Sequence, residues 1–281
     1  MTGGSPIIGR ENERAAIDDF LARVPAGPAS LDIVGEPGIG KTILLDELAA
    51  RAEARGMLVR VARPSPAEAS FSYAALGDLF GDLVEPGGEV HAALPEPQRW
   101  AIDVALLREA AGDRGLEVGA VAAAVRTVLV RLAAGRPILL VVDDRQWLDR
   151  ASEDVLRYTL RRVAGHPIGI AAGRRTVGGD DRPTGPLIDP GTAGIATSQI
   201  AVGRLSLAAL FRIVQDRFGL ALARRDLGRI DRLSAGNPFY ALELARVVRA
   251  TPPGEPLRLP AEAVDALREV LDRQPEATRR A

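Results

Sequence analysis

The stretch at residues 31–42, LDIVGEPGIGKT, decides the fold. An apolar run leads into the pattern G-x-x-x-x-G-K-T, and a helix-like amphipathic pattern follows it. This order of strand, glycine-rich turn and helix is the context that a phosphate-binding P-loop requires. Gly35, Gly38 and Gly40 let the backbone turn tightly and approach a ligand closely. The stretch therefore predicts a loop whose N–H groups form an anion cradle at a helix N-terminus.

Two residues at the end of this pattern receive separate roles. Lys41 is expected to reach the β- and γ-phosphates, and the hydroxyl of Thr42 is expected to bind Mg²⁺. Lys41 is also the only lysine in a chain that otherwise uses arginine, and a compact ammonium suits a site among phosphates better than a planar guanidinium. A glycine-rich turn without a ligand is the alternative interpretation. The nucleotide contacts predicted in this loop are Glu36, Pro37, Gly38, Ile39, Gly40, Lys41, Thr42 and Ile43.

A second apolar run, at residues 138–142, ends in two carboxylates, Asp143 and Asp144. A buried parallel strand delivers such acids to the carboxyl edge of its sheet, where ligands bind. Asp143 is expected to hold Mg²⁺, directly or through water, and Asp144 to orient or deprotonate the attacking water. The alternative is a strand that ends in solvated aspartates beside a helix cap.

The strand predicted at residues 168–173 ends in two arginines. At the carboxyl edge of the sheet, beside the acid-bearing strand, one of them is placed to sense the γ-phosphate. Arg174 is the candidate named for this role, although Arg175 is an open alternative. A solvated terminal pair is the interpretation without function.

Composition excludes several classes of protein. Net charge is −1, the sequence pI is near 6.2, and there are no cysteines and two histidines. These values argue against a nucleic-acid surface, a disulfide framework and a histidine-rich metal site. No apolar run reaches the roughly 18 residues that span a bilayer, and a signal-peptide pattern is absent, so a cytoplasmic location without membrane contact is expected.

The pattern of elements predicts an α/β fold with a parallel P-loop sheet of the ASCE type, followed by a small helical lid. The nucleotide-binding domain is expected at residues 1–204, the lid at 205–250, and a linker with the first helix of a truncated next domain at 251–281. A long segment without periodicity, residues 176–198, precedes a last short strand at 200–202. A helix capped by Ser152 is expected at residues 152–163. Asn237, which follows the glycine stop at Gly236, is expected to cap the helix that begins at Pro238.

Several motifs together resemble one family. They are Gly9-Arg10-Glu11 with Glu13, the P-loop, Asp143-Asp144 with Trp147 and Asp149, the arginine pair, and Gly236-Asn237-Pro238 with Glu243. In order and spacing they resemble the N-terminal ATPase region of the large ATP-binding regulators of the LuxR family, within the STAND class of P-loop ATPases.

The resemblance implies further site residues and partners. In that family the Gly-Arg-Glu segment and the Gly-Asn-Pro turn lie near the adenine, so the resemblance implies that Arg10, Glu11 and Pro238 lie near the nucleotide. Asp32 differs from the apolar residue that is usual in this strand of relatives. The resemblance also implies other domains of a full-length regulator as partners. Relatives bind DNA through a C-terminal helix-turn-helix, which is not visible in this sequence, so no DNA contact is expected from this chain.

The predicted function is binding and slow hydrolysis of Mg-ATP as a conformational switch of a transcriptional regulator. Two alternatives stay open. One is a module that holds ADP and never turns over. The other is a P-loop kinase for a small molecule, which would need an acceptor pocket; Asp143-Asp144 followed by Trp147 fits a water-activating ATPase better.

Overall fold

The computed structural model describes residues 7–176, 185–219 and 224–250. By their contacts these residues belong to two compact units. The sheet unit consists of Asn12–Glu36 and Lys41–Ala201, and the helical unit consists of the described parts of Met1–Glu11, Pro37–Gly40 and Val202–Ala281. The middle of the glycine-rich loop, Pro37–Gly40, is therefore grouped by its contacts with the helical unit.

The sheet unit is built on five parallel strands in the order β2-β3-β4-β1-β5. The apolar runs that predicted strands form its centre, and every residue of β1 and β3 is buried. The strands are β1 (Ala29–Gly35), β2 (Leu58–Ala62), β3 (Ile138–Val142), β4 (Ile168–Arg175) and β5 (Ala196–Ala201).

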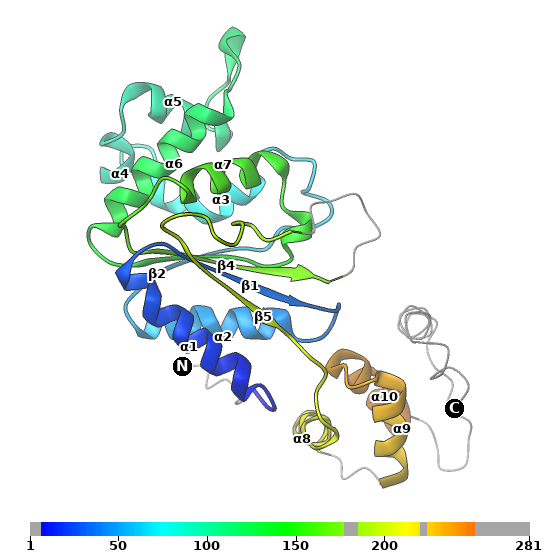
Figure 1. Ribbon diagram of the computed structural model, residues 1–281. Coiled ribbons are helices and arrows are strands. Elements are labelled where there is room, and N and C mark those ends of the chain that lie inside the picture. Colours follow the sequence, from blue (N-terminus) through cyan, green and yellow to red (C-terminus); the bar gives the residue numbers. More distant parts are fainter. Residues whose placement is uncertain (1–6, 177–184, 220–223, 251–281) are drawn as a thin grey trace. The chain divides into compact units, whose positions relative to one another are not determined.

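Helices cover both faces of the sheet, as a parallel sheet requires. Figure 1 shows α1 and α2 on one face and α3, α6 and α7 on the other. Buried side chains of α3, α6 and α7 form one core cluster with β3 and β4. The helices of this unit are α1 (Glu11–Arg23), α2 (Lys41–Ala54), α3 (Ala74–Phe80), α4 (Glu89–Ala92), α5 (Glu96–Ala105), α6 (Val118–Ala133) and α7 (Arg150–Leu160), with short 3-10 turns at Val24–Ala26, Gly81–Val84, Gly112–Arg114 and Arg145–Trp147.

Two local predictions were wrong. The last strand starts at Ala196, inside the segment expected to be loop, because an edge strand with the half-exposed sequence ATSQIA carries no continuous apolar pattern. Helix α7 is capped by Asp149 rather than Ser152: the Asp149 carboxylate accepts the N–H of Ser152 at 2.8 Å.

The helical unit contains α8 (Leu207–Phe218), α9 (Arg224–Ser234) and α10 (Pro238–Ala250). Its core joins Leu210 and Val214 of α8 to Ile230 of α9 and Leu244 of α10. The turn between α9 and α10 passes through Ala235 and Gly236, both at positive φ. The predicted linker and helix at residues 251–281 lie outside the described residues.

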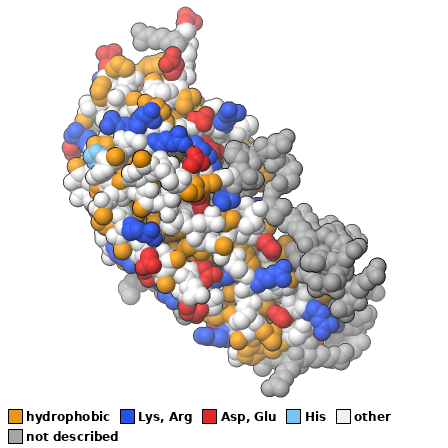
Figure 2. Space-filling view, viewed as in Figure 1, with side chains coloured by type: hydrophobic (Ala, Val, Ile, Leu, Met, Phe, Trp, Pro, Cys, Tyr) orange, Lys and Arg blue, Asp and Glu red, His pale blue; other side chains and the backbone are white. Residues whose placement is uncertain are grey.

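Two features of the structure concern the predicted lack of nucleic-acid and membrane contacts: the distribution of surface charge and the length of the helices. On the face shown in Figure 2, acidic and basic side chains of the described residues are interspersed. Within the described part of the chain, every helix is too short or too polar to cross a bilayer.

Candidate functional site

Lys41 is the first residue of α2 and its side chain is buried. Its Nζ donates to the carbonyls of Gly35, at 3.1 Å, and Glu36, at 2.9 Å. Burial lowers the pKa of the Lys41 ammonium, and the Asp144 carboxylate acts in the opposite direction. The loop thus holds the one lysine of the chain in a desolvated position. The attraction between this ammonium and an anionic ligand is stronger there than it would be in water.

The two glycines of the loop segment Pro37–Gly40 adopt conformations that other residues rarely take. Gly38 has φ +73° and Gly40 has φ +105°. A Cβ at Gly38 would lie 2.8 Å from Cβ of Phe239 and 3.3 Å from Oδ1 of Asn237, whereas a Cβ at Gly40 meets nothing within 4 Å. Gly38 is therefore required by close packing as well as by its backbone conformation, and Gly40 by its conformation alone.

Two side chains of the helical unit hold carbonyls of this segment. The Arg10 guanidinium donates to the Ile39 carbonyl at 2.8 Å and to the Gly203 carbonyl at 2.7 Å. The side-chain amide of Asn237 donates to the Pro37 carbonyl at 3.0 Å. The sequence predicted Arg10 beside the nucleotide, and the structure places its guanidinium on the backbone of the loop.

Asp143 and Asp144 follow β3 at the carboxyl edge of the sheet, as expected. Asp143 is buried, and its Oδ1 accepts the N–H of Asp144 at 2.9 Å. Asp144 is half-buried at φ 49°, a left-handed conformation that aspartate tolerates better than most residues, and its Oδ1 accepts from Gln146 at 2.6 Å. The turn directs two carboxylates with different surroundings to one edge of the sheet.

Gly173 of β4 leaves the room that the Asp143 carboxylate occupies. A Cβ at Gly173 would lie 3.0 Å from Oδ1 of Asp143 and 2.9 Å from Cδ1 of Leu45. Since a real Cβ rarely approaches so closely, a larger residue here would displace the carboxylate.

The two arginines after Gly173 have different partners. Arg174 Nη2 donates to Gln199 at 3.3 Å, and its Nε lies 4.0 Å from Oδ1 of Asp32. Arg175 Nε lies 3.9 Å from Oδ1 of Asp144, and its guanidinium carbon lies 6.0 Å from the centre of the Trp147 ring. Of the pair, Arg175 is the one beside the acid-bearing turn.

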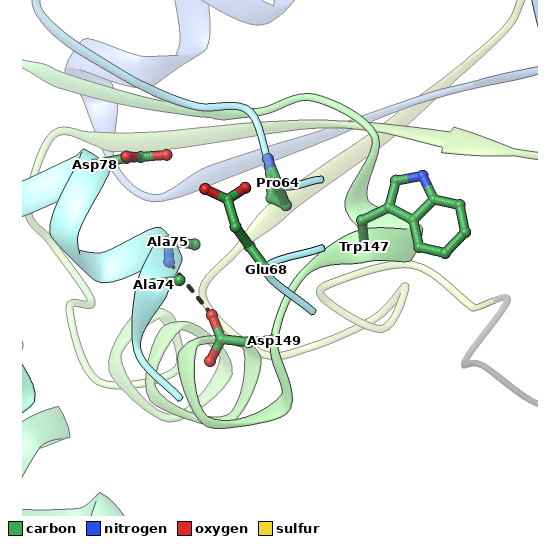
Figure 3. A pocket seen from close by; sticks show the side chains of 7 residues that line it. All are labelled: Pro64, Glu68, Ala74, Ala75, Asp78, Trp147 and Asp149. Carbon is green, nitrogen blue, oxygen red and sulfur yellow. Dashed lines mark hydrogen bonds between the residues drawn. The ribbon is translucent and has the colours of Figure 1, made fainter. Parts of the chain in front are cut away.

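A small hollow lies beside this turn, between the loop after β2 and the start of α3 (Figure 3). Asp149 accepts hydrogen bonds there from the N–H groups of Tyr73, at 2.8 Å, and Ala75, at 3.3 Å. Together with its bond to the N–H of Ser152, these contacts connect the start of α3 to the start of α7 through the Asp149 carboxylate. The lining residues are Pro64, Glu68, Ala74, Ala75, Asp78, Trp147 and Asp149.

The remaining predicted site residues lie as follows. Thr42 and Ile43, in the first turn of α2, are exposed, with Ile43 57% exposed. Glu11, the first residue of α1, is exposed, and Pro238, the first residue of α10, is half-buried. Glu36 contributes its carbonyl to Lys41.

The sequence suggested no role for Gly173. Asn237 caps α10, as the sequence predicts: its Oδ1 accepts the N–H of Phe239 at 3.1 Å. Its contact with the Pro37 carbonyl was not predicted. Gly173 interrupts an otherwise apolar strand directly before the arginines, a signal for close approach of another group.

These residues fit a nucleotide with Mg²⁺. The loop offers a desolvated cation and a backbone shaped by glycine, and Asp143 offers carboxylate oxygen, the ligand type that Mg²⁺ prefers. Among the described residues, no group of three His, Cys, Asp or Glu side chains is placed to hold a metal alone. A Mg²⁺ ion here would therefore depend on phosphate oxygens, with Thr42 and Asp143 as its protein partners.

Comparison with known proteins is consistent with this geometry. The model of the AAA ATPase domain family matches residues 6–170. No curated protein matches the sequence.

Three solved structures are similar to this chain to different degrees. Cdc6p from Pyrobaculum aerophilum is similar with a TM-score of 0.54 and 18% identity, over 98% of this chain and 73% of that one. RuvB from Thermotoga maritima has a TM-score of 0.49 and 17% identity, over 95% of this chain and 71% of that one. A STAND protein with a tetratricopeptide repeat sensor from Pyrococcus horikoshii has a TM-score of 0.45 and 13% identity, over 92% of this chain and 32% of that one. The predicted class, a parallel P-loop sheet followed by helices, is confirmed.

Proposed function

This chain belongs to the AAA ATPase domain family, and on that premise we propose that it binds Mg-ATP and hydrolyses it slowly as a conformational switch. One observation carries the proposal: the only lysine of the chain is buried, with its ammonium fixed on the Gly35 and Glu36 carbonyls. Within residues 7–176, 185–219 and 224–250, its hydrogen-bond partners are backbone carbonyls and no carboxylate. A buried ammonium in such surroundings is costly, and a polyphosphate is the partner that a loop of this kind accepts.

We assign the chemical roles by position. Thr42 and Asp143 would hold Mg²⁺, which neutralises charge on the phosphoryl oxygens when it is bound. Asp144 would orient the attacking water or accept its proton, with its carboxylate held by the Gln146 amide. Catalysis of this kind rests on positioning and on charge stabilisation.

We assign the phosphate-sensing role to Arg175 in place of Arg174. The side chain of Arg175 lies beside Asp144, whereas that of Arg174 is bound to Gln199 and lies near Asp32. A cation beside Asp144, the residue proposed to orient the attacking water, is placed to stabilise negative charge on the transferred phosphoryl group.

The regulatory part of the proposal rests on the motif resemblance to the STAND regulators of the LuxR family. ATP would favour closure of the helical unit, and hydrolysis would release it. The grouping of Pro37–Gly40 with the helical unit supports this coupling, because Lys41, the next residue of the same loop, belongs to the sheet unit. DNA binding would belong to other domains of a full-length regulator, and the chain would act in the cytoplasm.

The test uses one purified sample. Part of it is denatured and the released nucleotide identified; the rest is assayed for phosphate release from Mg-ATP without any acceptor. We expect steady turnover in the wild type and none in Lys41→Ala. Lys41→Arg, which keeps the charge but not the compact geometry, should be strongly impaired.

Arg63→Ala is the matched control, since Arg63 forms an exposed ion pair with Asp46. Full activity of Lys41→Ala would overturn the P-loop assignment. Tightly held ADP without turnover would replace the ATPase by an ADP-locked module, and phosphate release only with a small-molecule acceptor would indicate a kinase.

A further inference from the structure

Asn237 is buried in the helical unit, only 1% exposed, and both ends of its side-chain amide form hydrogen bonds. Its Nδ2 donates to the Pro37 carbonyl at 3.0 Å, and its Oδ1 accepts the N–H of Phe239 at 3.1 Å. The orientation of the amide is fixed by these two partners. If it were reversed, Nδ2 would face the N–H of Phe239, and Oδ1 would face the carbonyl oxygen of Pro37. The side chain therefore specifies where the Pro37 carbonyl points.

Arg10 makes a similar contact with the carbonyl of Ile39, two residues after Pro37 in the loop. It is 4% exposed, and its two terminal nitrogens donate to the carbonyls of Ile39 and Gly203. The preceding residue, Gly9, has φ +70°, and a Cβ there would lie 2.7 Å from Cβ of Ala209 in α8. Close packing of Gly9 thus fixes the backbone that carries the guanidinium.

A held carbonyl also fixes the N–H group that follows it. In a trans peptide the C=O of one residue and the N–H of the next point in opposite directions. No described peptide bond of the chain is cis. The Asn237 contact on Pro37 therefore orients the N–H of Gly38, and the Arg10 contact on Ile39 orients the N–H of Gly40.

We propose that Arg10 and Asn237 are positioning residues for the anion cradle: they hold the Pro37 and Ile39 carbonyls outward so that the Gly38 and Gly40 N–H groups face the phosphates. The inference rests on the proposed nucleotide binding and deepens it. It assigns these residues to recognition of polyphosphate, while the motif resemblance places Arg10 near the base. An orienting contact that is already present costs no ordering when the anion binds.

The experiment distinguishes recognition of the phosphates from recognition of the base. Binding of Mg-ATP and of inorganic tripolyphosphate with Mg²⁺ is measured by calorimetry for the wild type, Asn237→Ala and Arg10→Lys. Lysine keeps the charge of Arg10 but loses the fork that spans two carbonyls. Each variant is expected to weaken both ligands by the same factor, about five- to tenfold, as the loss of one oriented hydrogen bond implies.

Arg246→Ala is the control, because Arg246 is exposed and pairs only loosely with Glu243 at 3.8 Å. Calorimetry reports the number of sites separately from the Kd, so partial unfolding of a variant does not imitate weaker binding. Weaker ATP binding with unchanged tripolyphosphate binding would overturn the inference in favour of a base contact, and unchanged binding of both ligands would also overturn it. A wild type that binds neither ligand would overturn the proposed function itself.

Discussion

Arg174 and Arg175 are consecutive in β4, and their side chains lie on opposite faces of the sheet. The preceding residue, Gly173, faces Leu45 of α2, so alternation along the strand directs Arg174 to the other face and Arg175 back to the side of α2. There Arg175 lies 3.9 Å from Asp144. Arg174 meets Asp32 of β1 and Gln199 of β5, which are paired across the sheet.

This division predicts opposite results for two otherwise similar substitutions. Arg175→Ala should lower ATP turnover by about 10²-fold or more, because it removes a cation beside the reacting group. Arg174→Ala should leave turnover within about threefold and lower the free energy of unfolding by about 1 kcal/mol, the usual value of a lost hydrogen bond. Steady-state phosphate release and urea unfolding measure the two effects; the reverse pattern would return the sensing role to Arg174.

A second prediction concerns the room beside Asp143. Gly173→Ala should push the Asp143 carboxylate away, since the new Cβ would lie 3.0 Å from its Oδ1. We expect the Mg²⁺ concentration for half-maximal turnover to rise several-fold, with little change in nucleotide binding measured without Mg²⁺. Gly119→Ala is the control: Gly119 lies in α6 with nothing within 4 Å of a Cβ, so alanine should stabilise the helix by about 0.5–1 kcal/mol. An unchanged Mg²⁺ requirement in Gly173→Ala would show that Asp143 does not need this space.

A third prediction concerns Asp149, whose role we expect to be structural, in contrast to the roles proposed for Asp143 and Asp144. Asp149→Ala should lower the free energy of unfolding by about 2–4 kcal/mol, because it removes the cap of α7 and leaves the buried N–H groups of Tyr73 and Ala75 without an acceptor. The Kd for ATP, measured well below the unfolding midpoint, should stay within about twofold. Asp154→Ala is the control, since Asp154 is exposed and lies 4.0 Å from Arg150; its unfolding free energy should change by less than about 0.5 kcal/mol. A stable Asp149→Ala that binds ATP poorly would contradict the structural role.

The sequence was most informative where one segment determines its own structure. The P-loop and the strand before Asp143 combine local turn chemistry with apolar runs, and both were predicted from the residues alone. The choice between Arg174 and Arg175 was not available from the sequence, because it depends on the register of β4 against β1 and of β1 against β5. The Asn237 contact has the same origin: it joins residues 200 positions apart.

Asp32 gives a final prediction, from a feature that the sequence marked as unusual. It is 4% exposed in β1, an interior strand of the sheet. Burial raises the pKa of its carboxyl, although the charges of Arg174, Arg145 and Arg157 and a hydrogen bond from the Leu187 backbone lower it. Between the unfolded value of 3.8 and the raised folded pKa, the native state binds more protons than the unfolded state, so stability falls as pH rises.

Asp32→Asn removes this titration while keeping the shape of the side chain. We therefore expect the unfolding free energy of the wild type, minus that of Asp32→Asn, to decrease as pH rises from about 4 to 7. The decrease should be about 1.4 kcal/mol for each unit by which the pKa is raised. Urea unfolding at several pH values measures the difference. A difference that increases with pH would mean that Arg174 stabilises the charged carboxylate by more than burial opposes it, and Asp32 would then be a net stabilising partner of Arg174.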